Sequence, residues 1–173
     1  MSNGIQSIRS RAGAVLAAVV AVFGGLLLPA VSAAGEVVDY GPFEETLRAH
    51  VDENGDVDYA ALAEDEKAAS KLDAFVESIA EAEVEGHGRA ARLAFYLNAY
   101  NATVLDEIAD RWPVDSPRDI DGFFDEIEHR IAGRKMTLDE LEHGLIREEF
   151  DEPRIHFVLV CAAEACPRLR REV

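Results

Sequence analysis

The stretch RAARLAFYLNAYNATVLDEIADR, residues 89–111, decides the fold of this chain. Apolar side chains recur along it every three or four residues, which is the spacing of one face of an α-helix. These side chains are Leu93, Leu97, Tyr100, Val104 and Ile108. The pattern predicts one long helix from Arg89 to Arg111 that packs along this face. Trp112-Pro113 follows directly and predicts the end of the helix.

Two asparagines lie in this helix, with Asn101 on the apolar face and Asn98 one turn before it. Asparagine is a poor helix former, and a buried amide costs free energy unless it is hydrogen-bonded. The two side chains therefore either tie down a loop backbone or orient the residues of a functional site.

Upstream, a short helix is expected over residues 43–51 and a longer one over residues 58–82. The alternating polar side chains between them resemble a calcium-binding loop. However, Gly55 falls at the fourth position of that loop and not the sixth, and Ala63 stands where a bidentate glutamate is needed. A turn at Asn54-Gly55 is therefore the better interpretation.

Downstream, residues 126–132 and 135–138 are expected to pair as a hairpin around Gly133-Arg134. Thr137 and Glu140 have the spacing of a capping box, which predicts a helix that ends near Phe150.

Residues 155–161 form a β-branched, apolar run that predicts a strand, and Pro167 suits the first position of another helix. The fold class expected from these elements is α+β, a helix-rich single domain with a small β-sheet.

An adjacent acid and base, Glu142 and His143, occupy the predicted helix before this strand. At 100° per residue Glu142 falls within the apolar face and His143 at its margin. A carboxylate directed at a core is costly unless it is paired. The two residues are either an acid–base pair or a structural Glu142–arginine ion pair beside a surface histidine.

Both cysteines of the chain, Cys161 and Cys166, lie near its end. Cys161 at a strand end is a candidate nucleophile, with His143 as its base, because alternation along a strand would turn His156 away from it. Cys166 precedes Pro167, an N-cap position that would favour a thiolate. A zinc site from the two cysteines and His156 lacks the usual fourth ligand. A Cys161–Cys166 disulfide would close only a small loop and suggests a redox switch.

The N-terminus has the features of a signal peptide. Arg9 and Arg11 precede an apolar run over residues 12–29, and Val31-Ser32-Ala33 offers small residues for cleavage. We expect a signal peptide over residues 1–33 and a periplasmic or secreted protein. The alternative is an uncleaved membrane anchor.

The formal net charge of −17 repels nucleic acid phosphates and anionic lipids, which excludes both as main partners. No cofactor or metal is predicted, and no membrane contact beyond the signal segment.

Three segments together resemble the domain of unknown function 547 family. They are RLAFYLNAYNATVLDEIADRWPVDSPRDI, MTLDELEHGLIR and PRIHFVLVCAAEACPRLR. The resemblance covers residues 57–173, after a lead-in over residues 34–56. It implies signature positions at Glu142, His143, Asn98, Tyr100, Asn101 and Cys161. It also implies that the family domain continues past residue 173, so that the domain is incomplete here at its C-terminus.

The family is in turn similar to papain- or transglutaminase-like thiol hydrolases. This similarity implies a thiol-dependent hydrolase or transferase that acts on an amide, peptide or thioester bond. Cys161 would be the nucleophile and His143 the base, with Glu142, Asn98 and Asn101 as orienting groups. A non-catalytic binding module and a redox switch are the alternatives.

Overall fold

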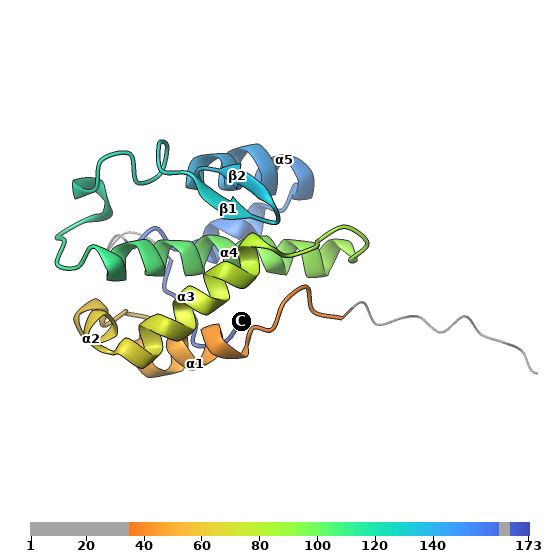
Figure 1. The fold of residues 1–173 in the computed structure, drawn as a ribbon. Helices are drawn as coiled ribbons and strands as arrows, with labels where there is room; N and C mark the ends of the chain where they lie inside the picture. Colours follow the sequence, from red (N-terminus) through yellow and green to blue (C-terminus); the bar gives the residue numbers. More distant parts are fainter. Residues whose placement is uncertain (1–34, 163–166) are drawn as a thin grey trace, which may run out of the picture. The chain divides into compact units, whose positions relative to one another are not determined.

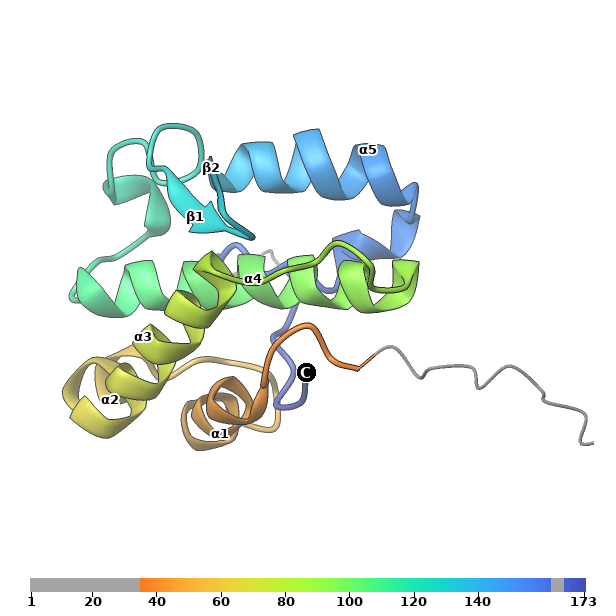
Figure 2. The ribbon, with the colours of Figure 1, turned by 45° about the vertical axis from the view of Figure 1, so that its right-hand side comes forward.

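The computed structural model describes residues 35–162 and 167–173. Its central element is α4, a 22-residue helix over Arg89–Asp110, as the apolar periodicity predicts. In Figures 1 and 2, α1, α2 and α3 lie on one side of α4, and a hairpin and α5 lie on the other. Because it is covered from two sides, α4 buries every residue from Ala99 to Leu105.

On the first side, α1 (Gly41–His50) and α3 (Glu66–Ala80) pack together through aromatic side chains. Phe43 and Phe75 stack with ring centroids 4.9 Å apart, and each is about 1% exposed. This stack fixes the first layer of the core.

The single helix expected over residues 58–82 is wrong, because the structure divides it into α2 (Tyr59–Glu64) and α3. Asp65 makes the break. Its backbone N–H donates to the carbonyls of Ala61 and Leu62, while its carboxylate accepts from the N–H groups of Lys67 and Ala68. One residue thus ends α2 and caps the start of α3.

The expected turn at Asn54-Gly55 is confirmed, since residues 52–56 form a turn between the paired residues Val51 and Val57. Gly55 has a φ of +83°, and a Cβ there would lie 2.7 Å from the carbonyl oxygen of Leu169. Only glycine allows the C-terminal segment to approach so closely. The Leu169 N–H donates to the Gly55 carbonyl at 3.3 Å, which attaches that segment to the turn.

On the other side of α4, the predicted hairpin is present but shorter. After the short 3-10 helix η1 (Pro117–Asp119), β1 (His129–Ile131) pairs antiparallel with β2 (Arg134–Met136). The turn is Ala132-Gly133, not Gly133-Arg134, and both residues have positive φ. Their N–H groups donate to the carbonyls of residues 79 and 80 at the end of α3, which fixes the hairpin against that helix.

The predicted capping box is confirmed. The Thr137 hydroxyl accepts from the N–H of Glu140, and the Glu140 carboxylate accepts from the N–H of Thr137. The helix that follows contains a π-helical segment, η2 (Glu140–Ile146), and ends as α5 (Arg147–Phe150). A π-helix bonds residue i to i+5, so each residue turns by less than 100°, and the predicted helical angles do not apply there.

The strand expected over residues 155–161 is wrong. Residues 153–157 form a 3-10 helix, η3 (Pro153–Phe157), and residues 159–161 have no regular structure. Pro153 supplies the fixed φ that suits the start of this helix. The helix expected to begin at Pro167 is also wrong, because the described residues 167–173 are irregular. Cys166, predicted as its N-cap, lies outside the described residues.

The structure confirms the α+β class: the fold is helix-rich with one small two-stranded antiparallel sheet among the described residues. No helix in residues 35–162 or 167–173 is long and apolar enough to cross a membrane. The chain's C-terminal end lies beside α1 (Figures 1 and 2), and the Arg171 guanidinium donates to the Arg48 carbonyl there.

Candidate functional site

Asn101 joins α4 to the segment that precedes Cys161. Its amide nitrogen donates to the Val158 carbonyl and its amide oxygen accepts from the Val160 N–H, both at 2.9 Å. The side chain is 6% exposed, so these bonds replace water for two backbone groups that have no neighbouring strand within the described ranges. Of the two roles predicted for the asparagines, the structure shows Asn101 in the backbone-holding one.

A cleft of about 340 Å³ opens beside this contact. It lies between α1, α4, the end of η3 and the C-terminal segment. Its lining is mainly apolar. The polar side chains in it are two asparagines, two arginines and one glutamate. The lining residues are Phe43, Leu47, Ala94, Leu97, Asn98, Asn101, Phe157, Val158, Arg168, Leu169, Arg170, Glu172 and Val173. The volume is in the lower part of the range for small-molecule sites.

Both predicted asparagines therefore line one cleft, but their side-chain amides have different hydrogen-bond partners. The Asn98 amide nitrogen donates to the Ala94 carbonyl of its own helix at 3.0 Å. Its oxygen has no hydrogen-bond partner among the residues that the structure describes. Asn98 is thus the asparagine with an acceptor available to a ligand.

Phe157 is the most exposed large apolar side chain of the cleft, at 75%. On the predicted strand, Phe157 would have shared one face with Ile155 and Leu159. The 3-10 turn of η3 buries those two residues and leaves Phe157 at the cleft wall. An exposed aromatic ring at a cleft is a feature of binding surfaces.

Glu142 is half-buried and paired. Its carboxylate accepts from Arg147 Nε at 3.2 Å, and the same guanidinium lies 2.9 Å from His156 Nε2. Arg147 thus connects η2 to η3. This is the Glu142–arginine ion pair that the sequence left open as one of two interpretations.

Glu142 also affects a neighbouring phenol. Burial, and after it the negative charges of Glu142 and Asp139, raise the pKa of Tyr100 above its usual range. His143, next to Glu142, is exposed and makes no hydrogen bond or ion pair within the described part of the chain. The acid and base that are adjacent in sequence therefore have different surroundings.

Cys161 directly follows the segment held by Asn101, and it is disulfide-bonded. A disulfide sulfur is not a thiolate, so in this state Cys161 cannot act as a nucleophile. A thiol mechanism at this position requires reduction first.

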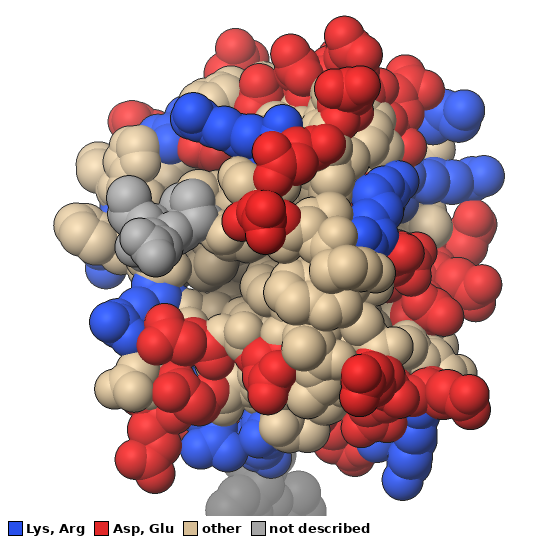
Figure 3. Space-filling model, turned by 90° about the vertical axis from the view of Figure 1, so that its left-hand side faces the viewer, with Lys and Arg blue, Asp and Glu red and all other residues tan. Residues whose placement is uncertain are grey.

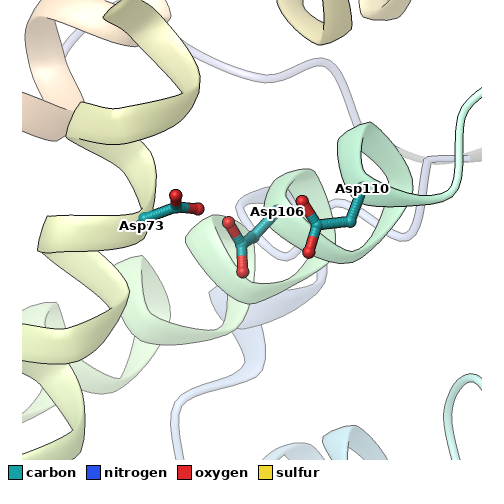
Figure 4. A group of neighbouring side chains, drawn as sticks. All are labelled: Asp73, Asp106 and Asp110. Carbon is teal, nitrogen blue, oxygen red and sulfur yellow. The ribbon is translucent and has the colours of Figure 1, made fainter. Parts of the chain in front are cut away.

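A group that sequence reasoning missed lies across α3 and α4 (Figure 4). Asp73, Asp106 and Asp110 each place a carboxylate oxygen within 4.8 Å of the others. None of the three forms a salt bridge within the described residues. Burial, then Asp110 and Asp73, raise the pKa of Asp106 to about 7. Asp106 and Asp110 have i, i+4 spacing, but nothing in the sequence places Asp73 beside them.

Three carboxylates are oxygen donors of the kind that Mg²⁺ or Ca²⁺ takes, although each ion needs about six ligands or more. Acidic side chains are common on the surface as a whole. Figure 3 shows them gathered on the upper and lower parts of one face, around a mostly uncharged area.

The fold and the cleft define a helix-rich α+β domain with a site of small-molecule size. The family described as "Protein of unknown function, DUF547" matches residues 84–173, a range that includes α4, η1, the hairpin, η2, α5, η3 and the C-terminal segment. The chain belongs to this family. Searches of curated proteins and of solved structures found no match.

Proposed function

We propose that this protein is an exported binding module whose cleft takes a small, largely apolar ligand. The single observation that carries the proposal is the cleft itself, about 340 Å³ in volume and walled by Leu47, Leu97, Phe157 and Leu169. Such an apolar lining with few polar groups is typical of ligand sites.

Export rests on the N-terminal sequence, with Arg9 and Arg11 before an apolar run and small residues at 31–33. Cleavage there would leave a chain that begins at Ala34. Cell fractionation followed by N-terminal sequencing tests this proposal. Recovery of the protein from the cytoplasm alone would contradict export, and an intact Met1 would contradict cleavage.

Ligand binding is tested with 1-octanol, a neutral apolar compound, by calorimetry on the full chain. Leu97→Asn places an amide in the apolar wall and is expected to weaken binding about tenfold or more, because it lowers the apolar contact area. Leu93→Asn is the matched control: Leu93 is also a partly buried leucine of α4 but does not line the cleft. Equal losses in the two variants, or no binding by the unmodified chain, would refute the proposal.

A thiol-dependent hydrolase or transferase is the second candidate, and one observation favours it. Asn101 lines the cleft and holds the backbone of Val158 and Val160, which leads into Cys161. After reduction, the Cys161 thiol would give its proton to His143 and attack the carbonyl of an amide, peptide or thioester. This forms a thioester at Cys161 and releases an amine or thiol, which takes the proton from His143; water or an acceptor nucleophile would then cleave the thioester. Glu142 and Asn98 would orient His143 and the substrate carbonyl, and Asn101 would act as a positioning residue for the backbone before Cys161.

Iodoacetamide alkylation, mapped by mass spectrometry, separates the two candidates. The full chain is compared before and after treatment with a dithiol, which reduces the disulfide to two thiols and is itself oxidised. The binding-module proposal predicts that Cys161 of the reduced chain labels slowly until the pH exceeds about 8, as an ordinary thiol does. Rapid labelling near pH 6 would instead indicate an activated thiolate and favour the enzyme.

A further inference from the structure

Charged groups gather at one end of the cleft, in the C-terminal segment. Arg168 and Arg170 carry positive charge there and Glu172 carries negative charge. Among the described lining residues the charged groups are the side chains of Arg168, Arg170 and Glu172 and the carboxylate at the chain end, Val173. These four charges sum to zero, whereas the chain as a whole has a net charge of −17. A lining without net negative charge repels an anionic ligand group less than the acidic remainder of the surface does.

The two arginines have different partners. Arg168 Nη1 donates to the Asn54 carbonyl at 2.6 Å and lies 3.4 Å from the Asp56 carboxylate, so the turn at residues 52–56 engages it. Arg170 is exposed and has no hydrogen bond or ion pair in the described residues. Arg170 is therefore the cation of the cleft that a ligand can pair with.

We propose that the ligand is a medium-chain aliphatic carboxylate, with its chain against Leu47, Leu97 and Phe157 and its head group on Arg170. This inference rests on the proposed function of the same cleft. A guanidinium matches a carboxylate geometrically, because two parallel N–H groups donate to its two oxygens. Asn98 also lines the cleft. Its amide oxygen is an acceptor and would bind a carboxylate head group only through a bridging water.

The charged residues of the lining also limit the charge that the ligand's head group can carry. Glu172 repels a second negative charge, so a monoanion suits the site better than a phosphate with nearly two charges. A cationic head group would meet two arginines. The cleft volume of about 340 Å³ limits the length of the ligand's aliphatic chain and suits a small ligand.

The test compares octanoate with 1-octanol, which share an eight-carbon chain, by calorimetry on the full chain at pH 7.5 and below micelle formation. Octanoate is expected to bind about three- to tenfold more tightly, because its charge pairs with Arg170. Arg170→Gln is expected to remove this advantage, so that the ratio of the octanoate and 1-octanol affinities falls to about one. Glu172→Gln is expected to strengthen octanoate binding about two- to threefold, because it removes a repulsion.

Arg134→Gln is the matched control, since Arg134 is an exposed arginine of β2 outside the cleft lining, and it is expected to change neither affinity. Equal affinities for octanoate and 1-octanol, or an octanoate advantage that survives Arg170→Gln, would overturn the carboxylate proposal and leave the apolar cleft intact. Failure of both compounds to bind would overturn the binding function as well.

Discussion

Replacement of Asn101 by alanine is expected to lower the free energy of unfolding by about 2–4 kcal/mol, as measured by urea denaturation. The change removes two hydrogen bonds and leaves the Val158 carbonyl and the Val160 N–H without their partner. A buried backbone group left unpaired costs about 1–3 kcal/mol. The same variant is expected to lose 1-octanol binding, because Asn101 and Val158 both line the cleft.

Asn98→Ala is the control for this prediction, because Asn98 lies three residues away on the same helix and bonds only to Ala94 of α4. Its effect is expected to stay within about 0.5 kcal/mol, since alanine is the better helix former. Asn101→Asp keeps the acceptor for Val160 but presents a carboxylate oxygen to the Val158 carbonyl, and it is expected to be at least as destabilising as alanine. Similar effects at positions 98 and 101 would contradict the assigned role of Asn101.

The acidic triad gives the second large expected effect, a dependence of stability on pH. In the folded chain the pKa of Asp106 is about 7, above its ordinary value of 3.8. Between these values the folded state holds a proton that the unfolded state has lost, so stability falls as the pH rises. This contribution is fully present below about pH 4 and is lost as the pH passes 7.

Asp106→Asn imitates the protonated side chain and is expected to raise the free energy of unfolding by about 1–2 kcal/mol at pH 8, discounted for partial exposure. No gain is expected near pH 4. Denaturation is followed at both pH values with a chelator present, so that metal ions do not mask the repulsion. Asp110→Asn, at the exposed end of the triad, is expected to give a smaller gain. Destabilisation by Asp106→Asn at pH 8 would mean that the charged form has a favourable partner.

The parts of the fold that were predictable from sequence are those fixed by local patterns. The periodicity of α4, the capping box of Thr137 and Glu140, and the turn at Gly55 each depend on neighbouring residues. The break at Asp65 was missed because no large apolar residue lies between Leu62 and Leu72, so the periodicity gives no test of helix continuity there. The π-helical segment was missed because side-chain spacing alone does not reveal a change in backbone bonding.

The strand over residues 155–161 failed for a different reason. An apolar, β-branched run predicts a strand only if another strand pairs with it. Here the partner of Val158 and Val160 is a side chain, Asn101, which lies 57 residues earlier than Val158. The sequence did single out Asn101 as a buried amide in need of a bond, but no local pattern identifies the segment that it holds.

The two asparagines of the cleft were predictable from sequence, but most of its other lining residues were not. Asn98 and Asn101 were candidates from sequence, whereas Phe157 and Arg170 were not singled out by any pattern. Their place at the cleft depends on η3 and on the attachment of Leu169 to Gly55, both tertiary contacts. A site formed by segments far apart in sequence needs the structure to reveal it.

The most direct test of a ligand-binding cleft is an NMR titration of the isotope-labelled full chain with 1-octanol. The account predicts saturable shift changes that cluster at the amides of Leu47, Leu97, Val158 and Leu169, the elements that surround the cleft. Amides of the distant hairpin β1–β2 should remain unchanged. Shift changes centred on the hairpin, or none that saturate, would contradict the assignment of this cleft as the binding site.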